Sequence, residues 1–114
     1  MGGLSTHVLD TARGRPAAGV SVQLWRLEGE ERVLLGARTT DNDGRAAILS
    51  ADALQVGVYE LVFAAGPYLR TFQPSSDPAF LDDVVVRFGV ADASAKYHVP
   101  LLLSPYGYST YRGS

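Results

Sequence analysis

The sequence predicts an all-β fold in which eight short antiparallel strands form a sandwich or a barrel. Its 114 residues, 12.2 kDa in mass, suffice for one hydrophobic core, so residues 1–114 are expected to form a single domain. Apolar and polar residues alternate in short runs, as in strands with one buried face. Turn-forming residues interrupt these runs about every 8–12 residues, a spacing typical of all-β domains. Helical periodicity is nearly absent.

Each expected strand is a short β-favouring run, and most show the alternation clearly. In the first run Leu4, Thr6 and Val8 alternate with Ser5, His7 and Leu9, and Gly14 and Pro16 then interrupt the chain. The later runs follow the same rule. The eight runs cover residues 4–9, 20–25, 33–40, 45–49, 58–65, 84–90, 97–103 and 108–112.

Other residues predict how these runs are joined. The segment Asp41–Gly44 is a strong hairpin signal, because Asn, Asp and Gly tolerate the positive φ of tight turns. Gly66-Pro67 is expected to end the fifth strand, residues 68–72 to form one or two helical turns, and residues 74–78 to form a loop. Pro100 lacks an N–H, so its strand is expected to be an edge strand or bulged there.

Composition excludes several classes of protein. The absence of cysteine excludes disulfides and cysteine-ligated metal sites. A net charge of -2 is too neutral for a protein that binds nucleic acid or anionic membranes by charge alone. No run approaches the roughly 20 apolar residues that span a bilayer. The N-terminus lacks the basic and apolar regions of a signal peptide, so the expected compartment is the cytoplasm.

Few residues in this chain can carry catalysis. His7 and His98 are its two histidines, and Arg45 directly follows the Asp41–Gly44 turn. Each is a polar residue on a mostly apolar strand, near a strand end or turn. Taken alone, each histidine is more often solvent-facing or simply hydrogen-bonded, and Arg45 alone is more often a surface charge. Together they are the residues from which a site would be built.

The C-terminus concentrates aromatic residues. Residues 106–114 contain three tyrosines and Arg112, and such β-favouring residues predict an ordered segment rather than a frayed tail. If ordered, it brings an α-carboxylate beside the Ser114 hydroxyl. A metal could in principle use Asp10 beside His7, but the spacing of a dedicated site is absent, so no metal is expected. Ser5, Ser109 and Ser114 lack the nucleophile-elbow motif, and no cofactor-binding motif is present.

Four blocks of the chain resemble the signatures of one family. They are Leu4–Thr11 followed by Gly14–Ala17, then the Asp41–Arg45 turn, then Tyr97–Pro105, and finally Tyr108–Ser114 with its Tyr-Arg-Gly-Ser end. In order and spacing they resemble the 5-hydroxyisourate hydrolases of the transthyretin family over the whole chain. One departure is Lys96, where many members have a second histidine near His98.

The resemblance implies a specific fold, assembly and activity. The fold would be an eight-stranded transthyretin-like sandwich with one short helix, assembled as a homotetramer with its active sites at the dimer–dimer interface. The activity would be hydrolytic ring opening of 5-hydroxyisourate to 2-oxo-4-hydroxy-4-carboxy-5-ureidoimidazoline in purine degradation, without a cofactor. The family's functional positions fall on the following residues: His7, Arg45, His98, Tyr111 and Ser114. Arg112, a further member of the terminal tetrapeptide, is expected to bind substrate with Tyr111.

The expected chemistry suits these residue types. A histidine with a pKa near 6.5 can accept a proton from water, and a second can orient it or return a proton to the leaving nitrogen. The planar fork of Arg45 fits paired carbonyl and imide edges and can stabilise an oxyanion. Tyr111 is expected at the substrate rim, and Ser114 with its carboxylate can hold a histidine tautomer. Which histidine is the base stays open.

The alternative is a transthyretin-like carrier that binds a small molecule without catalysis, since fold does not fix function. A carrier channel would be lined by apolar and small residues. The joint presence of His7, Arg45, His98 and the Tyr-Arg-Gly-Ser end favours the enzyme. A purely structural sandwich domain is disfavoured because such secreted domains more often carry an export signal or a disulfide.

Overall fold

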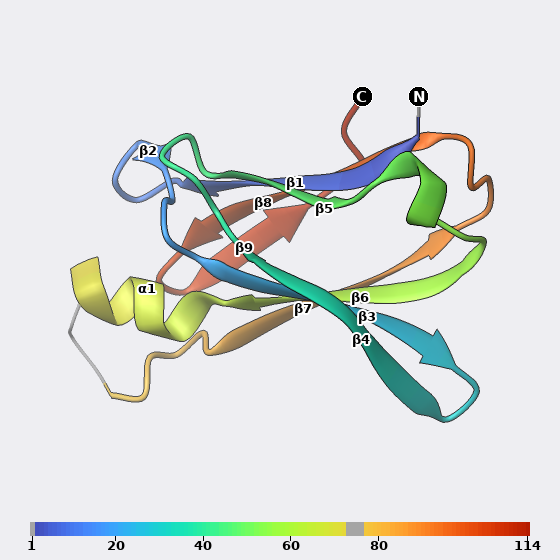
Figure 1. Ribbon diagram of the computed structural model, residues 1–114. Coiled ribbons are helices and arrows are strands. Elements are labelled where there is room, and N and C mark those ends of the chain that lie inside the picture. Colours follow the sequence, from blue (N-terminus) through green and yellow to red (C-terminus); the bar gives the residue numbers. More distant parts are fainter. Residues whose placement is uncertain (1, 73–76) are drawn as a thin grey trace.

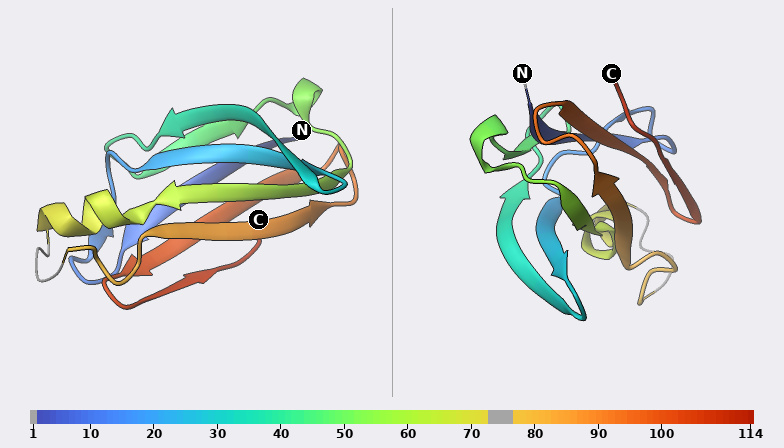
Figure 2. Two further views of the ribbon diagram at one scale, coloured as in Figure 1. Left: turned by 90° about the horizontal axis from the view of Figure 1, so that it is seen from below. Right: turned by 90° about the vertical axis from the view of Figure 1, so that its right-hand side faces the viewer.

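Two β-sheets packed face to face make up the computed structural model, which describes residues 2–72 and 77–114 (Figure 1). Sheet A consists of β1 (Gly3–Asp10), β2 (Arg15–Pro16), β5 (Arg45–Leu49), β8 (Lys96–Ser104) and β9 (Gly107–Thr110). Sheet B consists of β3 (Ser21–Glu28), β4 (Glu31–Thr39), β6 (Gly57–Ala64) and β7 (Asp83–Val90). The two layers are seen in the turned views of Figure 2. The sandwich prediction is therefore confirmed.

All eight expected runs are strands, and β2 is an additional two-residue strand within the described residues. In sheet B the strand order is β4-β3-β6-β7, and every pairing there is antiparallel. In sheet A, β1 pairs with β2 and β5 along one side and with β8 along the other. The β1–β8 pairing is parallel, whereas antiparallel pairing was expected throughout. These two strands are far apart in the chain, with β2 to β7 between them.

The Asp41–Gly44 turn forms where it was predicted, but the prediction that it closes a hairpin is wrong. Strand β4 before it pairs with β3 in sheet B, whereas β5 after it pairs with β1 in sheet A. The turn therefore carries the chain from one sheet to the other. This crossover delivers the start of β5 to β1.

The helix α1 (Ala65–Phe72) begins earlier than expected and includes Gly66-Pro67, which was predicted to end the strand before it. Proline is tolerated in the first turn of a helix, because its missing N–H needs no partner there. A short 3-10 helix, Ala51–Ala53, lies between β5 and β6. The loop predicted at 74–78 falls largely on residues 73–76, which lie outside the described residues. No helix in the described part of the chain is long and apolar enough to cross a membrane.

Pro100 lies in β8, a strand flanked by β1 and β9, so the prediction that it marks an edge strand is wrong. The β1 register runs past Pro100 without a shift, so no bulge forms on that side. On the other side the β9 ladder ends at Leu101↔Thr110, and one further bridge joins His98 to Gly113. Pro100 lies in this gap and has no N–H to donate to the neighbouring chain. Its carbonyl instead accepts a hydrogen bond from the Thr110 hydroxyl at 2.8 Å. Proline here interrupts the ladder within a central strand.

The core lies between the sheets and is formed by alternate residues of each strand. Its fully buried members include Val8, Leu24, Leu61, Phe63 and Leu101. After the buried Gly3, the buried residues on β1 alternate as Leu4, Thr6, Val8 and Asp10, so the residues between these four face outward from sheet A. This alternation positions the site, because His7 and Ser5 belong to the outward set.

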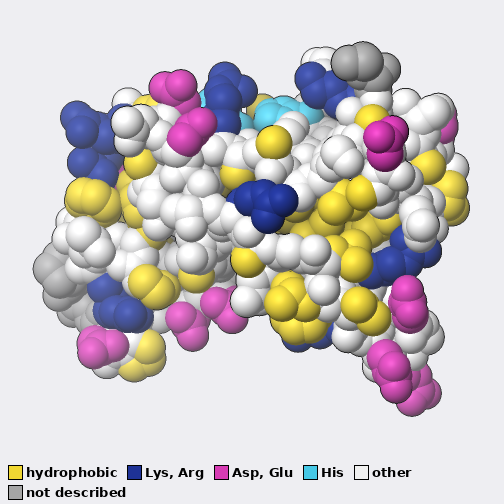
Figure 3. Space-filling model, viewed as in Figure 1, with side chains coloured by type: hydrophobic (Ala, Val, Ile, Leu, Met, Phe, Trp, Pro, Cys, Tyr) yellow, Lys and Arg dark blue, Asp and Glu magenta, His cyan; other side chains and the backbone are white. Residues whose placement is uncertain are grey.

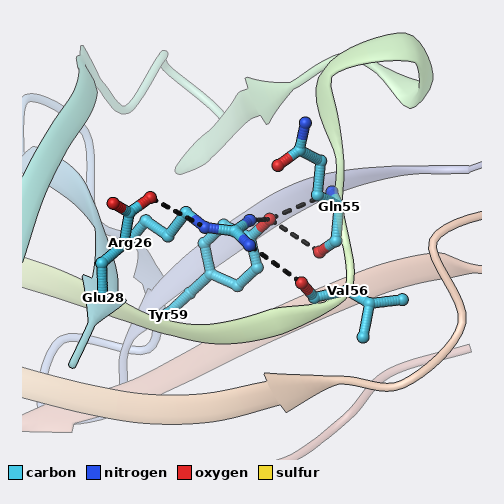
Figure 4. Close-up of polar contacts among 5 residues, drawn as sticks. All are labelled: Arg26, Glu28, Gln55, Val56 and Tyr59. Carbon is cyan, nitrogen blue, oxygen red and sulfur yellow. Dashed lines mark hydrogen bonds and ion pairs between the residues drawn. The ribbon is translucent and has the colours of Figure 1, made fainter.

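Two clusters of hydrogen bonds engage buried polar side chains of the sandwich. The Asp10 carboxylate accepts hydrogen bonds from the Ala12 and Arg13 amides and from the Tyr68 hydroxyl of α1. At the second cluster, drawn in Figure 4, Arg26 donates to the Tyr59 hydroxyl at 3.0 Å. The same hydroxyl donates to the Gln55 carbonyl at 2.7 Å. These bonds satisfy polar groups that burial would otherwise leave unpaired.

Candidate functional site

Three predicted site residues come together on the outer face of sheet A. His7 on β1 lies opposite Arg45 on β5, and Ser5, two residues before His7, lies opposite His98 on β8. Since residues two apart on a strand share a face, all four side chains project from the same side of the sheet. Figure 3 shows the histidine side chains along the upper edge of the molecule, with Lys and Arg side chains beside them.

An open hollow of about 380 Å³ lies on this face. It lies over β1, β5 and β8 and is lined by the following residues: Ser5, Thr6, Asp41, Arg45, Ala46, Ala47 and His98. The small side chains of Ala46 and Ala47 leave the space open, and Arg45 and His98 supply its polar walls. A small planar molecule could therefore lie against an arginine and an imidazole at once.

The His98 imidazole is held on two edges. Its Nδ1 lies 2.8 Å from Oγ of Ser5, and its Cδ2 edge is covered by Gly113, where an added Cβ would lie only 2.7 Å away. The Gly113 amide also donates to the His98 carbonyl at 2.7 Å. Ring and backbone are thus both fixed, and Nε2 is the ring nitrogen left for a substrate or water.

His98 carries a pKa below its ordinary value of 6.5. Burial is the largest cause, because it disfavours the charged imidazolium. The positive charges of Lys96, His7 and Arg45 lower this pKa further. The imidazole is therefore predominantly neutral at pH 7 and able to accept a proton.

His7 is held differently. Its Nε2 lies 2.8 Å from the backbone carbonyl oxygen of Asp43, in the Asp41–Gly44 turn. A carbonyl oxygen only accepts hydrogen bonds, so Nε2 of His7 carries a proton. In its neutral form this histidine has its lone pair on Nδ1. The two histidines therefore leave different nitrogens free.

The turn that holds His7 is itself fixed by Asp41. One carboxylate oxygen of Asp41 accepts the backbone N–H groups of Asp43 and Arg45, both at 2.9 Å. The hydrogen bond from the Arg45 amide is the main cause that lowers the pKa of Asp41 below its ordinary value. Asp41 thus fixes both the carbonyl that binds His7 and the start of the strand that carries Arg45.

Gly44 allows this turn to lie against β1. It has a φ of 76°, and an added Cβ would collide with the Val8 carbonyl oxygen. Its own carbonyl accepts the Val8 amide at 2.7 Å. Any larger residue would push the turn, and with it Arg45, away from His7.

The predicted C-terminal residues are brought to the site unequally. Gly113 lies against His98, and Ser114 is the next residue along. Tyr111 is 54% exposed. The Arg112 guanidinium lies 4.1 Å from the ring centroid of Tyr97 and donates to the Lys96 carbonyl at 3.1 Å. Because Tyr97 is buried on the core side of β8, Arg112 is held away from the hollow.

Asp10 does not join His7 in a metal site. It is buried on the core side of β1, whereas His7 projects outward, and its carboxylate is engaged by the Tyr68 hydroxyl at 2.7 Å and by two amides. Across residues 2–72 and 77–114, no cluster of three or more histidine, cysteine or acidic residues is arranged to hold a metal ion.

The sequence reasoning did not assign roles to Ser5, Asp43 or Gly113 in holding the histidines. It noted that Ser5 shares a face with His7, and it considered Ser5 only as a nucleophile. The signal it lacked was the pairing of β1 with β8, which brings Ser5 to His98 across 93 residues of sequence. A contact of Ser114 with a histidine stays a prediction, and Ser5 and the Asp43 carbonyl are residues that contact the ring nitrogens in this structure.

His98 and Arg45 line the open hollow, and His7 lies opposite Arg45 on the same face, an arrangement suited to binding or transforming a small polar molecule. The sequence model of the HIUase/Transthyretin family matches residues 4–113. The chain therefore belongs to the HIUase/Transthyretin family.

Named relatives are similar over nearly their full length. The chain is 59% identical to the 5-hydroxyisourate hydrolase of Mesorhizobium japonicum, covering 99% of this chain and 93% of that one. It is 52% identical to the 5-hydroxyisourate hydrolase of Deinococcus radiodurans, covering 98% and 96%.

Two solved structures have a similar fold. The 5-hydroxyisourate hydrolase of Klebsiella pneumoniae superposes with a TM-score of 0.82 at 37% identity, and each chain is covered in full. An (S)-allantoin synthase superposes with a TM-score of 0.88 at 40% identity, and the chain spans 44% of its length.

Proposed function

We propose that this protein hydrolyses 5-hydroxyisourate at the hollow on the outer face of sheet A. The observation that carries the proposal is the convergence of His7, Arg45 and His98 on that face. Relatives at 59% and 52% identity over nearly their whole length are named for this reaction. A carrier needs no such group of ionisable side chains.

The reaction opens a cyclic amide. Water adds to a ring carbonyl carbon, the carbonyl becomes an oxyanion, and the carbon–nitrogen bond then breaks to leave a carboxylate. The water must lose a proton, and the leaving nitrogen must gain one. The product is 2-oxo-4-hydroxy-4-carboxy-5-ureidoimidazoline, and its formation needs no redox cofactor and no group transfer.

His98 is the general base in this proposal. Its Nδ1 is engaged by Ser5, its Nε2 is free, and its lowered pKa keeps it neutral at pH 7. A neutral imidazole can accept a proton from water attacking the carbonyl. Since Nε2 of His7 donates to the Asp43 carbonyl, its Nδ1 is the nitrogen that can orient the substrate or water by accepting a hydrogen bond. The proton that His98 takes from water then returns to the leaving nitrogen from His98.

Arg45 binds the substrate. Its guanidinium offers several N–H donors in a plane, matching the adjacent carbonyl and imide groups of a flat heterocycle. The same donors stabilise the oxyanion as negative charge develops on the carbonyl oxygen. Its place on the hollow, with Asp41 fixing its backbone, supports this role.

The roles of the C-terminal residues are proposals of the same kind. Tyr111 is exposed, so it is available to a substrate at the rim or to a neighbouring subunit. Ser114 follows the residue that contacts His98, so its hydroxyl and α-carboxylate, if the natural chain ends there, would lie near the catalytic base. Arg112 was expected to bind substrate, and it would first have to leave the Tyr97 ring.

Assembly and location remain predictions for this chain. A homotetramer, built as a dimer of dimers, is expected from the family resemblance, and its neighbouring subunits would close the open hollow. Light scattering of the purified protein tests the assembly. A cytoplasmic location is likewise expected and is tested by cell fractionation. Residues 1–114 are proposed to act as one domain.

The decisive test is substrate decay. 5-Hydroxyisourate, freshly generated from urate by urate oxidase, decays slowly in buffer and is followed by its ultraviolet absorbance. With this protein the decay accelerates in proportion to protein concentration, and chromatography identifies the ureidoimidazoline product. A decay rate equal to that in buffer, together with saturable binding of the substrate, would instead favour the carrier.

A further inference from the structure

We propose that Ser5 and Gly113 act as positioning residues that clamp the His98 imidazole and set its tautomer, with the proton on Nδ1 and the lone pair on Nε2. The inference deepens the proposed hydrolysis, on which its catalytic consequence rests. It assigns a purpose to a serine on β1 and to a glycine in the C-terminal segment, both of which contact the same ring.

The Ser5 side of the clamp follows from strand pairing. Ser5 lies directly opposite His98 across the parallel β1–β8 pair, and both side chains project outward. The 2.8 Å separation of Oγ and Nδ1 is a full hydrogen bond. Both groups are partly buried, so water competes weakly for this bond.

The Ser5 hydroxyl can accept from Nδ1 or donate to it, and the proposal assigns it the acceptor role. The neutral imidazole carries one proton, and the partner of one ring nitrogen determines which nitrogen holds it. The charges of Lys96, His7 and Arg45 already disfavour an added proton on His98. A proton on Nδ1, donated to the Ser5 oxygen, leaves Nε2 bare and available to accept one from water.

The Gly113 side of the clamp is steric. Gly113 has no φ in the left-handed region, so its own backbone would accept alanine. An added Cβ, however, would lie 2.7 Å from Cδ2 and 3.4 Å from Cγ of His98, so the ring would have to turn away. Turning the ring would stretch its bond to Ser5 and move Nε2. Glycine is therefore required here to leave room for the His98 ring, and not for its backbone conformation.

The test combines side-chain nitrogen NMR with steady-state kinetics on the whole protein. Because the chain has two histidines, both can be resolved, and His7 serves as an internal reference. In the wild type, His98 is expected to have a protonated Nδ1 and a bare Nε2, while His7 carries its proton on Nε2. Ser5→Ala is expected to mix the His98 tautomers and leave His7 unchanged.

The kinetic readout separates positioning from substrate binding. Ser5→Ala should lower kcat about tenfold with little change in KM, since one hydrogen bond is worth roughly a factor of ten. Ser5→Thr keeps the hydroxyl on a β-favouring residue, so it should restore both the wild-type tautomer and kcat. An unchanged His98 tautomer in Ser5→Ala, or an unchanged kcat, would overturn the proposal.

Gly113→Ala provides the second arm, with a matched glycine as control. It should lower kcat and shift the His98 signals while the fold persists. Gly89→Ala places the same methyl group where nothing lies within 4 Å and should leave both readouts unchanged. Equal behaviour of the two variants would remove Gly113 from the clamp. If the NMR results hold but the wild type fails to hydrolyse 5-hydroxyisourate, the clamp stands and the proposed function falls.

Discussion

The outer faces of the two sheets both carry ionisable side chains, but these side chains are ion-paired on sheet B and line an open hollow on sheet A. On sheet B, both oxygens of buried Glu60 are bonded, to Arg32 at 3.0 Å and to Arg87 at 2.9 Å. Arg32 also covers the Trp25 ring at 4.1 Å. On sheet A, Arg45 and His98 line an open hollow, and His7 projects from the same face opposite Arg45. The charges of Glu60, Arg32 and Arg87 on sheet B neutralise one another, whereas Arg45 and His98 on sheet A can contact a bound molecule.

The pKa values of the two faces express the same contrast. Hydrogen bonds from Arg87, then from Arg32, lower the pKa of Glu60 below its ordinary value of 4.5, which stabilises its charged form. Burial, then repulsion by Lys96, lowers the pKa of His98, which stabilises its neutral form. A paired charge contributes to folding, whereas burial and nearby cations keep His98 in the neutral form, which is the form that can act as a base. Substitutions on the two faces should therefore affect different measurements.

The largest effect is expected from His98→Asn. Removing the proposed base should lower kcat by about 10²–10⁴-fold, the range that general-base catalysis contributes. Because His98 is only half-buried at the surface, the melting temperature should change little. The measurement pairs the substrate-decay assay with thermal unfolding by circular dichroism. Retained activity in a folded variant would move the catalytic role to another residue.

Arg45→Lys is expected to follow, with about a 10–100-fold loss of kcat/KM. Lysine keeps the charge but loses the planar set of donors that matches paired carbonyl groups. Initial rates across a range of substrate concentrations measure this loss. Wild-type kinetics in this variant would mean that Arg45 supplies only charge.

On sheet B, Glu60→Gln should lower stability without lowering activity. Loss of the paired carboxylate should reduce the free energy of unfolding by about 1–2 kcal/mol, since the exposed arginines can rehydrate. Denaturant unfolding at pH 7 measures this change, and activity per folded molecule is the control. Because the folded pKa is lowered, the stabilisation is present above pH 4.5 and lost as pH falls through the folded value. A stability gap that does not narrow as the pH falls below 4.5 would contradict the role assigned to Glu60.

The smallest effect concerns pH. His98 has a lowered pKa, so the neutral form persists below pH 6.5, and the rate should fall only as pH drops through that lower value. Lys96→Gln removes one of the repelling charges and should move this acid limb upward by a fraction of a pH unit. The pH dependence of kcat/KM for the two proteins measures the shift. An acid limb that stays in place would exclude Lys96 as a determinant of the base.

How far the sequence predicts the molecule differs between fold and site. Alternation and turn residues predicted all eight of the expected strands, because both are local properties of the chain. These local properties did not predict three features: the parallel β1–β8 pairing, the crossover at Asp41–Gly44 and the start of α1 at Ala65. The pairing and the crossover depend on which distant strand lies beside each segment, and a helix boundary is the least reliable part of a sequence prediction.

For the site, the sequence predicted residues but not their contacts. Motif resemblance selected His7, Arg45 and His98, and the fold brings these three to one face. The sequence alone did not predict the contact between Ser5 and His98, because 93 residues separate them. It also expected Arg112 to bind substrate, whereas its guanidinium stacks on Tyr97, because consecutive residues on an extended segment alternate between faces.

The contrast between the two faces is tested most directly by one decay experiment with three proteins. Freshly generated 5-hydroxyisourate is mixed with the wild type, with His98→Asn or with Glu60→Gln at equal concentrations of folded protein. The wild type and Glu60→Gln should accelerate its decay equally, and His98→Asn should leave it near the rate in buffer. A wild type no faster than buffer, or a His98→Asn variant as fast as the wild type, would contradict a catalytic face on sheet A.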